Sequence, residues 1–213
     1  MNQWSLHLRH LQFDVEFHRY FFSLFLAFIP EQNRFLNIVP IQGKEWRISL
    51  EVNVHQGSGN EHNEVLRMTS DESMSIGPGT RLPLITVMPN RNEFSVNVQT
   101  TQAHTAAYAT FQLNQWYKLE VNHYKMGPRR SMIIWHVDEV EKKRIVQEAV
   151  PEFTNVKCFT ASKFKQSLKG QIRNLKFVQG QEKLRGECIK IKEAESTFQN
   201  SKLTNFYWQQ FEP

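Results

Sequence analysis

Residues 46–55 read Trp46-Arg47-Ile48-Ser49-Leu50-Glu51-Val52-Asn53-Val54-His55, with large apolar side chains at every even position and polar ones at every odd position. Successive side chains of a β-strand point to opposite faces, so this alternation predicts a strand with one buried and one solvent-facing side. Such strands are the norm in antiparallel sheets that bury one face. We therefore expect the even residues to be buried, the odd ones to be exposed, and the protein to be an all-β, two-sheet antiparallel sandwich.

Similar runs occur along most of the chain, at the intervals that are typical of a β-sandwich. The predicted strands are Phe35–Pro40, Trp46–His55, Glu64–Thr69, Leu84–Met88, Glu93–Thr100, Trp116–Tyr124, Met132–Val137, Val140–Val146, Val156–Thr160 and Gln171–Val178. Turn-forming residues separate them, as in Gly77-Pro78-Gly79. The dipeptide Asp138-Glu139 stands between two of these strands and indicates a hairpin tip.

The 213 residues suffice for one sizeable β domain with short terminal extensions. We expect an N-terminal extension over 1–32, the sandwich over 33–180 and a C-terminal tail over 181–213. The segment 21–29 has a single polar residue, Ser23, and is too short to span a bilayer as a helix. Its length suits a secretory signal, although Asp14 and Glu16 precede it. An atypical export signal is the preferred interpretation, and an added strand of the domain is the alternative.

Charge is unevenly distributed along the chain. Residues 118–192 carry 17 Lys or Arg against 8 Asp or Glu, whereas the other residues carry 9 against 13. This asymmetry favours a basic face in the C-terminal half, suited to an anionic partner, with an ordinary solvated surface as the alternative. The two cysteines, Cys158 and Cys188, have no zinc-site spacing, and the sequence leaves open whether they form a disulfide or are free thiols.

Six short motifs occur in a recognisable order over about 145 residues. They are the segments 43–52, 64–69, 79–85, 113–121, 151–157 and 170–175. In this order and spacing the chain resembles a laminin-G-like domain of the concanavalin A-like lectin and glucanase superfamily, in the form common in invertebrate extracellular proteins. The resemblance implies a jelly-roll sandwich, an extracellular location, and binding of a glycan, often sulfated, or of another protein.

Three features of these motifs lead to structural predictions. Trp46 and Trp116 each open a strand, and we expect both indoles to face inward, where they bury a large area. Gly170 precedes the last strand, where a close backbone approach is expected. The hairpin tip Asp138-Glu139 lacks the glycine that favours a two-residue turn, so we expect a longer loop there.

No catalytic constellation is present in the sequence. Glycoside hydrolases of this superfamily carry a Glu-x-Asp-x-x-Glu motif, which supplies the two carboxylates that the reaction needs, and the chain has no such motif. The eight histidines lack zinc-site partners. Stacking aromatic–basic motifs and a helix-turn-helix pattern are also missing, so nucleic acid is not an expected partner.

Two sets of residues are candidates for ligand binding. Laminin-G-like domains often hold one calcium at the rim, and Asn63, Asp71 and Glu72 are weak candidates, with a metal-free polar turn as the alternative. The stronger set is basic, because Lys and Arg bind sulfate and carboxylate groups well. Its members, expected to converge on one face, are Lys163, Lys165, Lys169, Arg173 and Lys176, with Lys157 nearby.

The sequence therefore predicts a non-enzymatic extracellular recognition module that binds a glycan, anionic in the basic-face hypothesis, or another protein. A divergent polysaccharide-active enzyme on the same fold and a structural domain without a ligand site are the alternatives. No cofactor is indicated beyond the calcium candidate, and no membrane span is expected.

Overall fold

In the computed structural model, the described residues are 20–42, 45–72, 77–99, 105–127, 130–148, 152–163 and 165–179. Within these ranges the chain forms thirteen β-strands and no helix, hence no helix that could cross a membrane. All of these residues belong to one compact unit, Met1–Gly180. The tail 181–213, the first nineteen residues and Cys188 lie outside the described residues.

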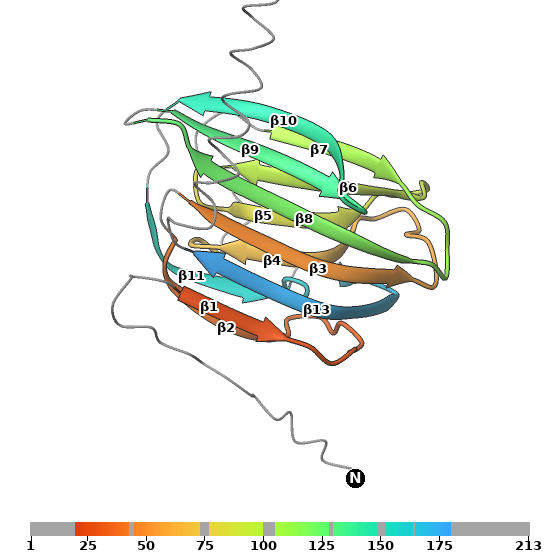
Figure 1. Ribbon diagram of the computed structural model, residues 1–213. Coiled ribbons are helices and arrows are strands. Elements are labelled where there is room, and N and C mark those ends of the chain that lie inside the picture. The colour runs from red at the N-terminus through yellow and green to blue at the C-terminus, as the bar shows by residue number, and fades with distance from the viewer. Residues whose placement is uncertain are drawn as a thin grey trace, which may run out of the picture. The chain divides into compact units, whose positions relative to one another are not determined.

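The strands form two stacked antiparallel sheets, which confirms the predicted sandwich (Figure 1). The six-stranded sheet has the order β1 (Tyr20–Leu24), β13 (Gly170–Gln179), β3 (Trp46–Val54), β8 (Trp116–Lys125), β9 (Arg130–Val137) and β10 (Val140–Glu148). The seven-stranded sheet has the order β2 (Phe35–Gln42), β11 (Phe153–Phe159), β4 (Asn63–Thr69), β5 (Arg81–Val87), β6 (Glu93–Gln99) and β7 (Thr105–Thr110). Its seventh member, β12 (Gln166–Ser167), pairs with β4 in parallel.

Strand β3 confirms the face assignment on which the fold prediction depends. Its even residues face the core, where Trp46 is 1% exposed and stacks on the His123 ring with the centroids 5.3 Å apart. The odd residues are half-buried rather than exposed, and Asn53 is buried. Side chains of the flanking strands β13 and β8 cover them; Arg173 and Asn174, for example, both reach the Glu51 carboxylate.

The prediction that Trp116 points inward is wrong. The core residues of β8 are Tyr117, Leu119 and Val121. Because side chains alternate, Trp116 must lie on the outer face of the six-stranded sheet, on the same side as Lys118. There its indole is half-buried, and the guanidinium of Arg173 lies over it. The strand itself was predicted correctly, but its buried face was assigned one residue out of register.

The expected long loop at residues 138–139 is also wrong. Val137 and Val140 pair directly, so the hairpin between β9 and β10 is a two-residue turn, and both of its residues have positive φ angles. The turn is fixed to the neighbouring strand β8: the Lys118 N–H donates to the Asp138 carboxylate at 2.8 Å, and the Asp138 N–H donates to the Lys118 carbonyl at 2.9 Å. These two hydrogen bonds hold the turn in a conformation that glycine would adopt more easily.

All ten predicted strands are present, with ends that differ by a few residues, but three strands were not among them. Strand β7 was missed because its sequence, TAAYAT, has small side chains and weak alternation. Strand β1 overlaps the first part of the apolar segment 21–29, and its residues pair antiparallel with β13. Beyond β1, Phe28 forms two backbone hydrogen bonds with Ile172, so this segment extends along β13.

Candidate functional site

A row of polar side chains crosses the outer face of the seven-stranded sheet. In β6, Phe94, Val96 and Val98 face the core, which turns Ser95 and Asn97 outward. The register places Ser95 between Thr86 of β5 and Tyr108 of β7, and the His62 Nδ1 lies 3.4 Å from the Thr86 hydroxyl. Asn97 donates to the Ser95 hydroxyl at 3.0 Å. We call this set the polar row; its members are His62, Thr86, Ser95, Asn97 and Tyr108.

The polar row combines a closed floor with an exposed aromatic side chain. Thr86, Ser95 and Asn97 are each less than a tenth exposed although they face outward. Tyr108, by contrast, is 54% exposed. A phenol ring that is open to solvent next to short hydroxyl and amide groups offers one apolar surface and several hydrogen-bonding atoms. This combination suits a ligand that has both apolar and hydroxyl-bearing faces.

A cluster of cations borders the polar row around one buried carboxylate, Glu64 on β4. Glu64 accepts a hydrogen bond from the backbone N–H of Ser162 and lies 3.6 Å from a guanidinium nitrogen of Arg67. Burial lowers the pKa of Arg81, and the positive charge of Arg67 lowers it further, whereas Glu64 opposes the effect. The two guanidinium groups are therefore close enough to repel each other.

The same crowding of positive charge reaches His62. Burial lowers the pKa of the His62 imidazole below its ordinary value of 6.5, and Lys165 and Arg81 lower it further. His62 is thus neutral at pH 7, and it contributes a hydrogen-bonding group rather than a charge. The cationic cluster consists of Arg67, Arg81 and Lys165. Glu64 interacts with Arg67 and Arg81, Glu72 interacts with Arg67, and Lys165 lies near His62. The remaining positive charge would stabilise a bound anion.

A small pocket lies on the same side of the sheet. Its walls are Asn33, Arg67, Thr69, Glu72, Phe159, Ser162 and Lys163. Its volume is about 10 Å³, which leaves room for roughly one water molecule. Lys157 contacts the Glu72 carboxylate there, and that hydrogen bond lowers the pKa of Glu72. This pocket is therefore too small to hold a ligand larger than a water molecule.

The five predicted basic residues do not share one face. Lys163 and Lys165 follow β11, beside the seven-stranded sheet, where Lys165 belongs to the cationic cluster. Lys169 directly precedes β13, whereas Arg173 and Lys176 lie on β13 in the six-stranded sheet. Alternation within single strands was recognised from the sequence, but the sheet to which each segment belongs was not.

The predicted calcium ligands do not converge either. Asn63 begins β4, whereas Asp71 and Glu72 follow its other end, at Thr69. Six residue steps of a strand separate Asn63 from Thr69 by roughly 20 Å, too far for one ion. The Asn63 side chain is buried, and Glu72 contacts Lys157. Among the described residues no group of three or more His, Cys, Asp or Glu side chains could hold a metal.

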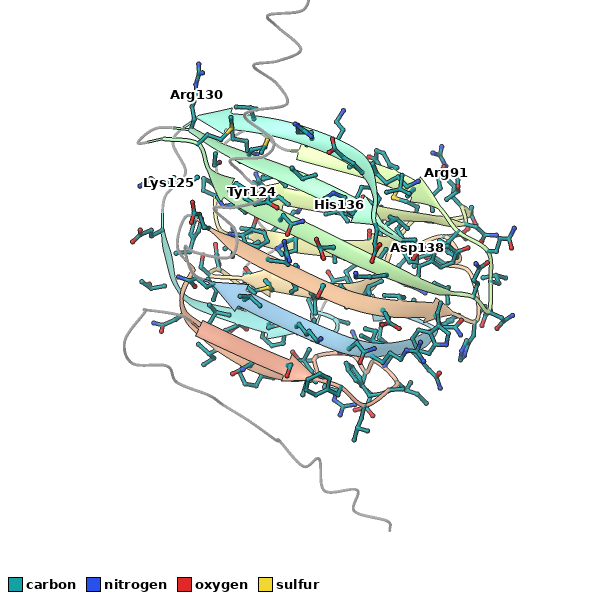
Figure 2. The ribbon with its side chains drawn as sticks, in the orientation of Figure 1. Arg91, Tyr124, Lys125, Arg130, His136 and Asp138 are labelled. Atoms are coloured by element: carbon teal, nitrogen blue, oxygen red, sulfur yellow. The ribbon has the colours of Figure 1, made fainter. Side chains whose placement is uncertain are left out.

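The outer face of the six-stranded sheet carries a different arrangement, in which charges are largely paired. Arg47 donates to Asn122 at 2.6 Å and lies 3.7 Å from Glu120, and Asn122 in turn contacts Glu120 and His136. His136 lies over this sheet between β8 and β9, and Asp138 lies at the end of β9 (Figure 2). Because the basic side chains of this face are already paired with acidic ones, they attract an added anion less strongly.

Only part of the polar row can be predicted from the sequence. The alternation of Phe94, Val96 and Val98 already implies that Ser95 and Asn97 face outward. Tyr108 could not be found, because its strand was missed, and the neighbours of Ser95 follow from cross-strand register. Cys158 plays no part in the row: it is a buried free thiol in the core, and burial raises its pKa.

Comparisons with known proteins find solved structures that are similar to this chain at low sequence identity. No protein-family model and no curated protein matches the sequence. A heptameric SAP-like pentraxin from Limulus polyphemus is 9% identical with a TM-score of 0.47, over 70% of this chain and 73% of that chain. Domain 4 of AbnA, a GH43 extracellular arabinanase from Geobacillus stearothermophilus solved with arabinotriose, is 12% identical with a TM-score of 0.49, over 72% and 82%.

The receptor-binding domain of botulinum neurotoxin type G is a further similar structure. It is 10% identical to this chain with a TM-score of 0.48, and the alignment covers 76% of this chain and 40% of that chain.

Proposed function

We propose that this protein is a non-enzymatic recognition module that binds an anionic glycan on the outer face of its seven-stranded sheet. The observation that carries the proposal is the polar row lying beside the cationic cluster. A laminin-G-like identity and an extracellular location belong to the same proposal, and the ordered sequence motifs support them.

Each part of the site matches one feature of a charged sugar. The exposed ring of Tyr108 would pack against the C–H face of a pyranose, beside the buried polar groups of Ser95 and Asn97. Arg81 and Lys165 would face a carboxylate or sulfate substituent. A neutral His62 can donate or accept, which suits a ring hydroxyl.

The acidic group at this site is poorly suited to glycoside hydrolysis. A general acid must be protonated at working pH, with a second carboxylate about 5–10 Å away. Glu64 instead accepts a hydrogen bond from the Ser162 N–H and pairs with Arg67, so both contacts already engage its carboxylate. We therefore propose binding without turnover. Reducing-sugar release from β-glucans or galactans above that of a heat-killed control would contradict this part of the proposal.

The binding test compares matched pairs of charges on a glycan array and a heparin column, with and without calcium. Arg81→Ala with Lys165→Ala removes two cations beside the polar row. Lys169→Ala with Lys176→Ala removes two cations on the other sheet and serves as the control. We expect the first pair to weaken retention at least several-fold, and retention of the parent to fall as salt rises, because exposed charges are screened beyond about 8 Å at physiological ionic strength.

Tyr108→Ala distinguishes a sugar site from a simple anion site. Loss of binding to the arrayed glycans and to heparin, with retention on a sulfonate cation-exchange resin unchanged, would show that the ring contacts the sugar. Equal losses in both charge pairs, with all thermal melts unchanged, would contradict the location of the site. A parent that binds no glycan with or without calcium and is not retained at low salt would contradict the function.

A further inference from the structure

Exposed apolar side chains concentrate at one edge of the sandwich. Between β1 and β2, Phe25 is 58% exposed, Leu26 74% and Ile29 64%. We call these three residues the apolar tip. Exposed apolar groups that gather in this way mark a surface that contacts a protein or a membrane, whereas single exposed ones need no explanation.

The backbone around the apolar tip is fixed, so the side chains are held in solvent by the fold. Phe28 exchanges two backbone hydrogen bonds with Ile172, at 2.9 and 3.0 Å, and its ring packs against the core. The Asn33 N–H donates to the Ala161 carbonyl at 3.0 Å, and Arg34 donates to the Ile29 carbonyl at 3.3 Å. The tip is therefore a built feature of the edge.

Cations border the apolar tip along β13. The Lys176 Nζ lies 5.3 Å from the centroid of the Phe25 ring. Lys169 is exposed and stands three residues before Ile172, the partner of Phe28. Glu31 lies 3.9 Å from Arg34, which offsets that charge, so Lys169 and Lys176 supply the positive charge of the border. Long lysine side chains can rest on apolar groups while their ammonium heads stay in water.

We propose that the apolar tip docks the domain on an anionic lipid membrane. The three side chains would enter the boundary between headgroups and acyl chains, and Lys169 and Lys176 would contact lipid phosphates. Surface-bound proteins commonly combine protruding apolar side chains with flanking Lys or Arg in this way. The proposal does not depend on the glycan site, which lies on the other sheet.

A second copy of the chain fits this edge less well. Adding a strand to β2 would need its outward backbone donors. Along one side of β2, however, the Ile38 N–H already donates to the Asn37 side chain at 2.8 Å, and Pro40 has no N–H. Both features are ways in which edge strands avoid pairing with other chains. The edge is thus blunted against strand addition while its apolar tip stays exposed.

Co-sedimentation with phosphatidylcholine vesicles, with and without phosphatidylserine, tests the proposal. We expect the parent to sediment with the phosphatidylserine vesicles. The triple variant Phe25→Ser, Leu26→Ser and Ile29→Ser should reduce the partition coefficient by about tenfold or more. This is the order of magnitude expected when three apolar side chains no longer enter the membrane. The control, Val140→Ser with Val146→Ser, changes residues that are 56% and 54% exposed at the opposite edge strand, β10, and should bind like the parent.

Two further measurements keep the outcome decisive. Leu26→Ser alone, at the most exposed position, should weaken binding with an unchanged melt even if the triple variant does not fold. Lys169→Ala with Lys176→Ala should remove the preference for phosphatidylserine. A parent that stays in the supernatant, or a well-folded Leu26→Ser variant that binds fully, would overturn the proposal. A parent dimer that Leu26→Ser dissociates would assign the tip to self-association instead.

Discussion

The guanidinium carbon of Arg173 lies 4.0 Å from the centroid of the Trp116 ring, although the two residues belong to strands on opposite sides of β3. The contact crosses β3 on the outer face of the six-stranded sheet, where Arg173 also donates to the Glu51 carboxylate at 2.7 Å. Trp116 is therefore a half-buried surface residue, and its environment differs from that of Trp46 in the core.

Replacing each tryptophan with alanine should have unequal effects on stability. Trp46→Ala removes a fully buried indole that stacks on His123 and should lower the free energy of unfolding by about 3–5 kcal/mol. Trp116→Ala removes a surface contact with Arg173 and should cost about 1 kcal/mol. Thermal and denaturant melts of both variants check this. Equal losses would mean that the indole of Trp116 is buried.

The two tryptophans show how far the sequence determines the fold. The alternation in 46–55 predicts both the strand and its buried face, because all five apolar side chains fall on the same face. In 116–124 the alternation of Leu119 and Val121 sets the inward face, whereas the initial tryptophan, taken alone, predicts the opposite one. Strand alternation is a local property that the sequence carries, and a single large side chain is a poor guide to it.

The candidate site could be predicted less well, because it depends on which strands become neighbours. The polar row joins Thr86, Ser95 and Tyr108 across three strands, and Lys165 reaches it from a connection some seventy residues later in the chain. Because alternate residues of adjacent strands share a face, the sequence predicts that Lys165, Lys169 and Arg173 converge. The fold instead places Lys165 beside the seven-stranded sheet and Arg173 in the six-stranded sheet. Cross-strand register is fixed by packing of the whole core.

Glu51 should make stability depend on pH. Partial burial would raise the pKa of its carboxyl, but hydrogen bonds from Asn174 and Arg173 outweigh burial and hold the pKa below its ordinary value of 4.5. A carboxyl with a lowered pKa in the folded state stabilises the protein above its unfolded pKa, and this contribution is lost as the pH falls through the folded value. Glu51→Gln should therefore lower the melting temperature at pH 7.

The difference between Glu51→Gln and the parent should shrink as the pH falls below 4.5, because protonation removes the same charge from the parent. Melts of both proteins from pH 7 to pH 3 measure this. A difference that stays constant over that range would show that the carboxylate charge is unimportant and that only the side-chain shape matters.

The turn between β9 and β10 offers a stabilising substitution. Glu139 has a φ angle of 69°, a backbone conformation that costs a non-glycine residue roughly 1–2 kcal/mol. Glycine avoids that cost, but its greater conformational entropy in the unfolded chain offsets about half of the gain. Glu139→Gly should raise the free energy of unfolding by up to about 1 kcal/mol, since the exposed ion pair with Lys118 contributes little.

Asp138→Gly is the control for this turn. Its φ angle is also positive, but its carboxylate accepts the Lys118 N–H, so the substitution loses a hydrogen bond along with the strain. Denaturant melts should show stabilisation by Glu139→Gly alone. Stabilisation of equal size in both variants would mean that the bond to Lys118 does not fix the turn.

Gly170 allows β13 to approach β3, as the sequence predicted. A Cβ atom at this position would lie 2.0 Å from the Asn53 carbonyl oxygen and 3.0 Å from its carbonyl carbon. Both are backbone atoms, so relief requires the two strands to separate near Ile172, the residue that also bonds to Phe28. Gly170→Ala should lower the free energy of unfolding by about 1–3 kcal/mol, the cost typical of overpacking.

Gly59→Ala is the matched control, because nothing lies within 4 Å of its added Cβ, and it should leave the melt unchanged. A parent-like melt for Gly170→Ala would mean that β13 can shift away from β3 at little cost.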